Sequence, residues 1–213
     1  MYELYYGAGA CSMAIHVILN ETGQAVNLKK INMMEGEHKT PAFLKMNPQG
    51  AVPVLLEDGK PLLEGAAQII YLCDTHKSAL LPQAGWERAQ ALQWLMFANA
   101  TLHPAYARGF WLMKRATFEN PSEKDNLLKQ ACAAIQGLWD NVEAHLARTG
   151  KPYLAGDAVT AGDILLTVIA NWGALPQAFT FGPKTQNLLK SIVARPAYQK
   201  ALAAEGVEYK AVA

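Results

Sequence analysis

The stretch that most constrains this chain is a glycine-rich turn with a cysteine at its end. Residues 2–6 form a short apolar and aromatic run that predicts a strand, and the run breaks at Gly7. From Ser12 onward the apolar residues recur at helical spacing. Cys11 is therefore expected at the point where a strand passes into the amino-terminal end of a helix.

That position has chemical consequences for the thiol of Cys11. The unpaired backbone N–H groups and the dipole of a helix amino terminus favour negative charge. A thiol placed there is expected to have a lowered pKa, and the thiolate is the nucleophilic form. The alternative is that Cys11 is a small core residue, which is the usual fate of a free cysteine. The turn alone leaves both interpretations open.

Composition bounds the class of protein. The 213 residues suffice for one large domain or two modest ones, 51% are hydrophobic, and the formal net charge is +1. No basic stripe indicates nucleic acid, and no apolar run indicates a signal peptide or a membrane span. Cys11, Cys73 and Cys132 are odd in number and far apart, so neither a disulfide framework nor a metal site is expected. We expect a cytoplasmic protein.

The segment up to residue 75 predicts a mixed α/β layer. Val26 and Leu28 alternate in a second strand over 25–31, and Thr40-Pro41 has the form of a helix cap followed by proline. Asp58-Gly59 between two apolar runs predicts a hairpin. The order is strand, helix, strand, short helix, hairpin and a helix opening at Glu64-Gly65. That order predicts a thioredoxin-like domain, with Cys11 at its first strand-to-helix turn.

After residue 78 the pattern becomes helical. Residues 79–85 are expected to form a linker, and 86–213 an all-helical domain, so the predicted domains are 1–78 and 86–213. Thr160 and Asp163 have the spacing of a capping box at a helix start. The expected helices cover about 86–115, 123–148, 160–174 and 183–204.

Several of these motifs, in this order, resemble a bacterial glutathione S-transferase. The cysteine in place of a catalytic serine or tyrosine is similar to the beta class of that family, and the resemblance implies the glutathione transferase fold. It runs from the first strand to the last helix. The motifs are Tyr6, Gly9-Ala10-Cys11-Ser12, Asn47-Pro48-x-Gly50-x-Val52-Pro53, Leu63-Glu64-Gly65, Thr160-x-x-Asp163 and Arg195-Pro196.

The resemblance implies a glutathione site in the first domain. Val52-Pro53 is expected to be cis, so that the N–H and C=O of Val52 can pair with the cysteinyl backbone of glutathione. Glu64 is expected to hold the γ-glutamyl ammonium group, and the N–H of Gly65 its carboxylate. The alternative for Glu64 is a carboxylate that only complements a helix dipole. Tyr6, Cys11, Ser12 and Pro53 belong to the same expected glutathione site, and the resemblance adds Asn99 and His103 to it from the helical domain.

The resemblance also implies residues from the helical domain. His103, with Asn99 one turn earlier, is expected to face the thiol, and His103 joins Cys11 as a catalytic candidate. Tyr106, Phe110 and Trp111 are expected to line the pocket for the acceptor substrate. The chain departs from the family pattern at Ala8 and Pro104 and at Gly65, which lacks a hydroxyl; Pro104 is expected to bend its helix.

Two mechanisms follow from the resemblance, with glutathione as co-substrate and no metal. Cys11 either stabilises the glutathione thiolate that attacks an electrophile, or itself attacks a disulfide and is resolved by glutathione. Proximity to glutathione's own sulfur favours the second. The family implies a homodimer active in detoxification. The alternatives are a glutathione-dependent isomerase, dehalogenase or ether-cleaving enzyme, or a non-catalytic ligand-binding relative.

Overall fold

The computed structural model describes residues 1–173, 175 and 178–212, and these form two compact units. The first unit comprises residues 1–89 and 193–209. The second comprises residues 90–192 with the chain's last residues from 210 onward. Each unit is described by itself below.

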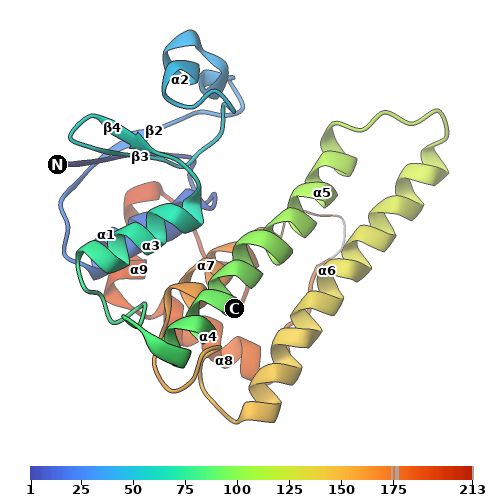
Figure 1. Ribbon diagram of the computed structural model, residues 1–213. Helices are drawn as coiled ribbons and strands as arrows, with labels where there is room; N and C mark the ends of the chain where they lie inside the picture. The colour runs from blue at the N-terminus through green and yellow to red at the C-terminus, as the bar shows by residue number, and fades with distance from the viewer. Residues whose placement is uncertain (174, 176–177, 213) are drawn as a thin grey trace. The chain divides into compact units, whose positions relative to one another are not determined.

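The first unit contains a four-stranded sheet with the order β2-β1-β3-β4 (Figure 1). β1 pairs with β2 in parallel, and the two other pairings are antiparallel. This is the predicted thioredoxin-like layer, and it is confirmed. The elements are β1 (Tyr2–Tyr6), α1 (Ser12–Glu21), β2 (Val26–Lys30), a 3₁₀ turn (Glu37–Lys39), α2 (Pro41–Met46), β3 (Val54–Glu57), β4 (Lys60–Leu62) and α3 (Gly65–Thr75).

Local sequence signals explain why these elements begin and end where they do. The side chain of Thr40 accepts a hydrogen bond from the N–H of Phe43 at 3.4 Å, which caps α2 as predicted. Asp58 and Gly59 both have positive φ, the backbone that a two-residue hairpin requires. α1 ends before Gly23, whose φ of 68° suits glycine.

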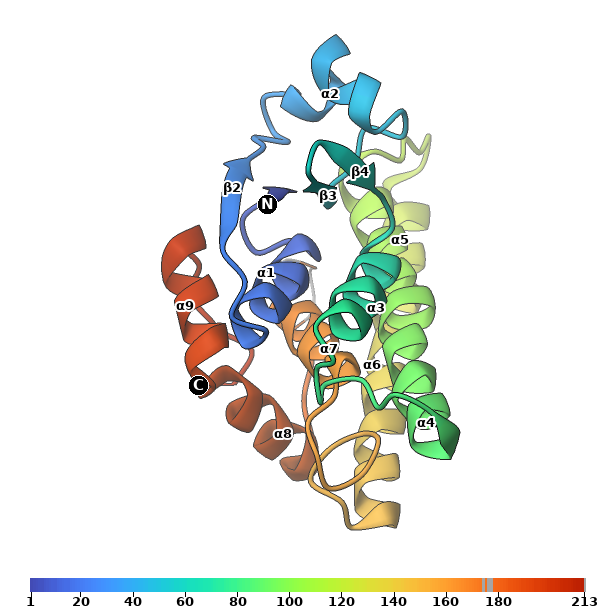
Figure 2. The same ribbon diagram turned by 60° about the vertical axis from the view of Figure 1, so that its left-hand side comes forward.

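The last helix, α9 (Pro196–Glu205), packs against α1 within the first unit (Figure 2). The guanidinium of Arg195 donates to both carboxylate oxygens of Glu21 at 2.6 and 2.8 Å. Asn20 Nδ2 donates to the carbonyl of Ala197 at 3.1 Å. The predicted domain 86–213 groups this helix with the helices that precede it in sequence, whereas the contacts group it with residues 1–89.

The expectation of one continuous helix over 183–204 is wrong. α8 covers Pro183–Val193, and α9 begins at Pro196. The residue before a proline is disfavoured in the helical region, and Arg195 is extended at φ −66° and ψ 135°. Pro196 then occupies the first position of the new helix, where its missing N–H costs nothing.

The predicted helix over 86–115 is interrupted in its middle. α4 (Gly85–Met96) passes into a π-helical segment, Phe97–Leu102, and α5 (His103–Lys114) follows. Pro104 lacks the N–H that would bond the carbonyl four residues earlier, and the wider π turn lies directly before it. The structure shows a change of helix type before Pro104, and the expected bend of the helix stays a prediction.

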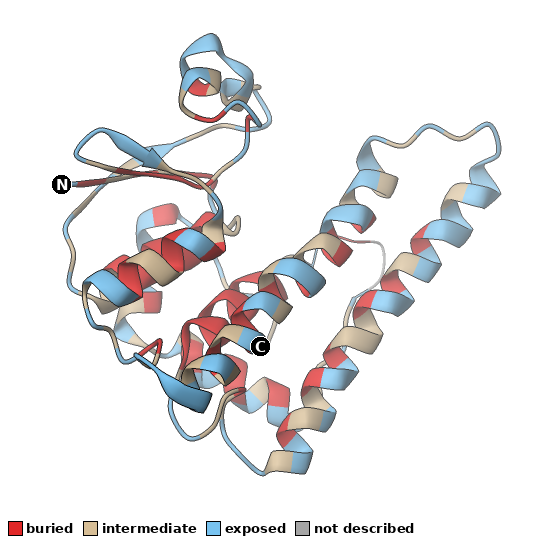
Figure 3. Cartoon of the chain, in the orientation of Figure 1, coloured by how far each residue is buried: buried red, intermediate tan, exposed pale blue. Residues whose placement is uncertain are grey.

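The core of the second unit is built around α7 (Ala161–Ala170), which is buried throughout (Figure 3). The capping box predicted from Thr160 and Asp163 is confirmed: Asp163 Oδ2 accepts from the Thr160 N–H at 2.7 Å. Burial raises the pKa of Asp163. The helix ends at Ala170 rather than near 174, and residue 174 lies outside the described residues. α6 (Pro121–Thr149) repeats buried residues along one face (Figure 3).

Throughout the described ranges, no helix combines the length and the apolar character needed to cross a membrane.

Candidate functional site

The turn between β1 and α1 is closed by its own hydrogen bonds. The N–H of Ala10 donates to the carbonyl of Gly7 at 3.0 Å. Ser12 is fully buried, and its hydroxyl accepts from the Gly7 N–H and donates to the Gly7 carbonyl, both at 3.2 Å. The Ser12 hydroxyl, expected to contact glutathione, thus already holds the turn. Cys11, one residue before Ser12, occupies the N-cap position of α1.

Cys11 reaches from this turn to the loop that precedes β3. Its thiol donates to the carbonyl oxygen of Val52 across 3.7 Å, a distance within the range of a sulfur hydrogen bond. The Val52-Pro53 peptide bond is cis, as the resemblance implied. Two segments 41 residues apart therefore meet at the thiol.

The expected lowering of the Cys11 pKa is wrong for the protein without ligand. Burial raises the pKa of the thiol to about 11, and the Glu64 carboxylate adds to the rise. The backbone N–H groups of Ser12 and Cys11 act in the opposite direction, as expected at a helix start. Their effect on the pKa is smaller than the cost of placing a charge where little water reaches it.

The loop before Pro53 is held by buried side-chain amides. Asn47 is buried, and its Nδ2 donates to the carbonyl of Ala51 at 2.8 Å. Gln68, fully buried on α3, donates from one Nε2 to the carbonyls of Pro53 at 3.2 Å and Leu62 at 2.8 Å. Sequence reasoning missed Gln68. The available signal was a polar residue between the apolar positions of the buried face of α3.

A second residue missed from the sequence is Lys39. Its ammonium donates to the carbonyls of Gln49 at 3.1 Å and Gly50 at 3.2 Å. A β-carbon added at Gly50, where φ is 61°, would lie 2.6 Å from Lys39 Nζ. No local pattern links the lysine to a loop ten residues later, so the sequence offered no signal for this contact.

The amino terminus of α3 lies against the cis proline. Glu64 is exposed and precedes the helix with φ 66° and ψ 108°, a conformation that non-glycine residues rarely adopt. Among the described residues, its side chain makes no cap hydrogen bond to the helix. A β-carbon at Gly65 would lie 3.6 Å from Pro53 Cγ. Gly65 therefore lies beside Pro53, and the roles of Glu64 and Gly65 in binding glutathione stay predictions.

Three further candidates have distinct surroundings. Tyr6 is buried at the end of β1, and burial raises the pKa of its hydroxyl. His103 begins α5 and packs edge-on against Trp172, with ring centroids 4.9 Å apart. Burial lowers the pKa of His103, which favours the neutral imidazole. Asn99 is half-buried in the π-helical segment. His103 and Cys11 belong to different compact units, so their approach stays a prediction.

The predicted acceptor residues differ in burial. Tyr106 is fully buried, and its hydroxyl accepts from Trp139 Nε1 at 3.0 Å, so it is part of the helical core. Phe110 is half-buried beside it, with ring centroids 6.3 Å apart, and Trp111 is 56% exposed. The acceptor role of these three stays a prediction. A pocket of about 410 Å³ in the same unit is lined by other residues: Ala170, Asn171, Gly173, Ala178, Phe179, Phe181, Lys210 and Ala211.

Within the described part of the chain, no three His, Cys, Asp or Glu side chains gather in a way that could hold a metal ion.

Comparison with known proteins places this geometry in a family. The model of the glutathione S-transferase N-terminal domain matches residues 2–73. A glutathione S-transferase from Xylella fastidiosa has a similar structure, with a TM-score of 0.86 and 26% identity over 98% of this chain and 100% of that one. A glutathione transferase homologue from Sulfitobacter, solved with bound glutathione, has a TM-score of 0.82 and 26% identity over 98% and 99%. A glutathione S-transferase of Xanthomonas campestris is 33% identical over 176 residues, 80% of this chain and 81% of that protein. This chain belongs to the glutathione S-transferase family of enzymes.

Proposed function

We propose that the first unit binds glutathione in an extended form along Val52, with its sulfur beside Cys11. The observation that carries the proposal is the 3.7 Å contact between Cys11 Sγ and the Val52 carbonyl. A peptide that pairs with the Val52 backbone comes within reach of the thiol. No described residue accepts a hydrogen bond from the Val52 N–H, so this donor is open to such a peptide. The bound glutathione of the Sulfitobacter homologue supports the choice of ligand.

The γ-glutamyl end is assigned to Glu64 and Gly65. An exposed carboxylate suits the ligand's ammonium group, and a helix amino terminus suits its carboxylate. The positive φ of Glu64 supports this assignment, because strained backbone is concentrated at ligand sites. Lys39 brings a cation to the neighbouring loop and is a further candidate for the ligand's second carboxylate.

Conjugation to a hydrophobic electrophile is the reaction that the raised pKa of Cys11 favours. A thiol with a pKa of about 11 is protonated at neutral pH, so it can donate its S–H to the sulfur of glutathione. The glutathione thiolate then forms the new bond to the electrophile, whose leaving group departs with the electron pair. We assign the chain to a beta-like class with a role in detoxification, on the basis of the cysteine at this turn.

Thiol–disulfide exchange is the second candidate. Cys11 as a whole residue is intermediate in exposure, although little water reaches its sulfur, whereas Cys73 and Cys132 are buried. After losing its proton, Cys11 would attack a disulfide, form a mixed disulfide and release one thiol. A glutathione thiolate would then attack that bond and restore the Cys11 thiol. Ser12 cannot act as a resolving cysteine, so the exchange would use one thiol.

The variant Cys11→Ser separates the two reactions. Serine keeps a donor but cannot form a disulfide, so conjugation of an aryl halide is expected to persist and exchange to be lost. Mass spectrometry of the wild type with oxidised glutathione is expected to show one adduct, on Cys11. Cys132→Ser is the matched control and leaves both activities unchanged. A Cys11→Ser enzyme that still exchanges thiols would refute the covalent route, and loss of both activities would refute the donor role.

A further inference from the structure

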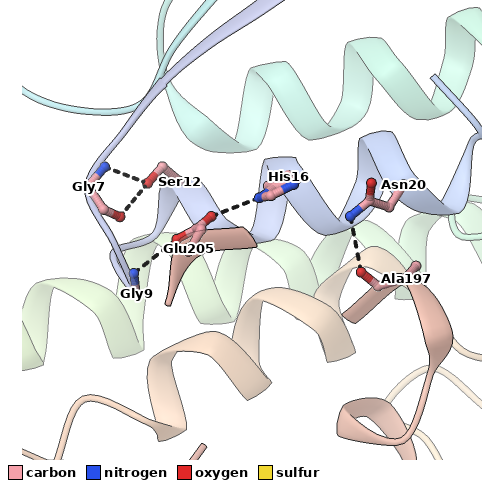
Figure 4. A network of polar contacts seen from close by, with 7 residues as sticks. All are labelled: Gly7, Gly9, Ser12, His16, Asn20, Ala197 and Glu205. Atoms are coloured by element: carbon pink, nitrogen blue, oxygen red, sulfur yellow. Dashed lines mark hydrogen bonds and ion pairs between the residues drawn. The ribbon is translucent and has the colours of Figure 1, made fainter. Parts of the chain in front are cut away.

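A buried pair of ionisable side chains lies behind the Cys11 turn, and the proposed chemistry does not use it. Glu205 Oε1 is 2.9 Å from His16 Nδ1, and the two side chains are 0% and 2% exposed (Figure 4). His16 is on α1, and Glu205 is the last residue of α9. No sequence pattern links His16 to Glu205, because 189 positions separate the two residues.

The second oxygen of Glu205 reaches the turn itself. Oε2 accepts a hydrogen bond from the backbone N–H of Gly9 at 3.0 Å (Figure 4). Gly9 has φ +67°, a conformation for which glycine is suited. One carboxylate therefore bridges α1 and the turn that delivers Cys11, two residues after Gly9. A carboxylate bound to a backbone N–H makes one of the stronger hydrogen bonds in proteins.

A second contact joins the same two segments at the other end of α1. Arg195, just before α9, is bidentate with Glu21, the last residue of α1. Both contacts fasten α9 to α1, but only the Glu205 contact also includes the turn, through Gly9. A variant at Glu21 therefore tests the docking of α9 on α1, and a variant at Glu205 tests in addition the position of the turn.

We propose that Glu205 is a positioning residue for Cys11: it fixes the Gly9 peptide, and with it the direction in which the thiol points. The inference deepens the proposed function and rests on it, since it assumes that reaction occurs at Cys11. Displacement of a reacting group by about 1 Å can cost up to ~100-fold in rate. A carboxylate anchored by buried His16 restrains the turn against such a displacement.

If the His16–Glu205 pair only stabilised the fold, a folded variant without the pair would keep the wild-type kcat. Replacement of a buried ion pair by apolar residues of similar volume is often neutral for stability, whereas removal of one partner strands a buried charge. The double variant Glu205→Met/His16→Leu should therefore stay folded while it loses the hydrogen bond from the Gly9 N–H to Glu205. Glu205→Gln retains an oxygen that can accept from Gly9. Glu21→Gln weakens the contact at the far end of α1 and is the matched control.

The experiment measures turnover of glutathione with an aryl halide, together with alkylation of Cys11 by iodoacetamide without glutathione. In the double variant kcat is expected to fall ~tenfold, with the KM for glutathione changed less than ~twofold, because the turn moves but the Val52 and Glu64 contacts remain. Cys11 alkylation, followed by mass spectrometry, is expected to become several times faster as the thiol leaves Val52. Glu205→Gln and Glu21→Gln should both stay close to the wild type.

Wild-type kcat and alkylation rate in the folded double variant would overturn the inference. A fall of kcat in Glu21→Gln as large as that in the double variant would also overturn it. Should the double variant not fold, Glu205→Asp shortens the acceptor arm and is expected to show the same changes at smaller size; wild-type behaviour there is equally decisive. A wild-type enzyme without any glutathione turnover would refute the proposed function. The alkylation comparison would still decide the role of Glu205.

Discussion

At Cys11 two electrostatic effects act on one thiol in opposite directions. The backbone N–H groups at the start of α1 favour the thiolate, and burial favours the neutral thiol more strongly. Position in the sequence reveals the first effect only, because burial depends on segments such as the Val52 loop that pack over the sulfur. The neutral thiol then acts as a hydrogen-bond donor, to Val52 here and to a ligand sulfur in the proposed complex.

This balance predicts the pH profile of Cys11 in the ligand-free enzyme. With a pKa of about 11, about one thiol in a thousand is ionised at pH 8, so alkylation should accelerate tenfold per pH unit and level off only near pH 11. The unfolded thiol ionises near ~8.5, so this group's contribution to stability is complete below that pH and is lost as pH rises toward 11. Iodoacetamide kinetics measured by mass spectrometry provide the test. A plateau near pH 8 would contradict the assigned environment.

Glu64 provides a second test at the residue scale. Glu64→Ala removes a charge-assisted contact to the ligand's ammonium group, and Glu64 contributes less than burial to the raised Cys11 pKa, so affinity should fall more than the rate of the chemical step. The expected loss is ~1.5–3 kcal/mol in the free energy of glutathione binding, measured by titration calorimetry. Glu3→Ala, which removes a surface carboxylate of β1, is the control and should bind as the wild type does. Unchanged affinity in Glu64→Ala would exclude the proposed ligand orientation.

At the scale of elements, α3 supports the cis-proline loop through one side chain. Gln68 bonds the carbonyl of Pro53 and that of Leu62, so the helix, the loop and β4 are held together by a single amide. Without Gln68, the carbonyls of Pro53 and Leu62 would both lose the hydrogen bond from its amide. A buried acceptor without a donor is costly, which gives the amide its value in an otherwise apolar face.

Gln68→Leu should therefore destabilise the first unit by ~1–3 kcal/mol in the free energy of unfolding. Urea denaturation followed by circular dichroism measures the change. Gln130→Leu is the matched control, because Gln130 is exposed on α6 and bonds Asn126 across one helical turn. Its effect should stay below ~0.5 kcal/mol. Equal stability of Gln68→Leu and the wild type would show that the amide does not hold the loop.

Elements whose ends are set by their own residues could be predicted from sequence. The hairpin at Asp58-Gly59, the Thr40 cap and the Thr160 capping box each depend on neighbours a few residues away. The π-helical segment was not predicted, because a proline indicates that a helix is disturbed but not which helix type results. Pro196 indicates the break at Arg195, because the residue before a proline is disfavoured in the helical region, and the prediction of one helix over 183–204 does not account for it.

At the scale of the whole molecule, the contacts that matter most to the site join distant parts of the sequence. Glu205 and Gly9 are 196 residues apart, and Gln68 and Lys39 act on carbonyls that no periodicity connects to them. The candidate ligand residues Val52, Glu64 and Gly65 came from resemblance instead. Their ligand roles stay predictions, whereas no sequence pattern connects the residues that hold the Val52 loop and the Cys11 turn in place to the groups they bind.

Association with a second copy of the chain is the remaining prediction at this scale, and the resemblance implied a homodimer. Trp111 on α5 is 56% exposed, and a contact between copies is an alternative to its predicted acceptor role. Leu127 on α6 is 39% exposed, and the two helices pack together in the second unit. Contiguous exposed apolar side chains mark a contact surface, and Trp111 and Leu127 are the candidates for such a surface on this helix pair. In an isologous dimer the same surface of each copy takes part.

We therefore expect sedimentation velocity at micromolar concentration to give a species of twice the 23.2 kDa chain mass. Trp111→Glu places a charge where an apolar anchor is expected, and since such anchors contribute ~2 kcal/mol or more, dissociation should become about thirtyfold easier. Lys129→Glu alters an exposed charge on α6 and should leave the dimer intact. A monomeric wild type would contradict the prediction of a dimer. A dimer unaffected by Trp111→Glu would exclude this face, because a carboxylate buried there in each copy would lose its hydration without gaining a partner.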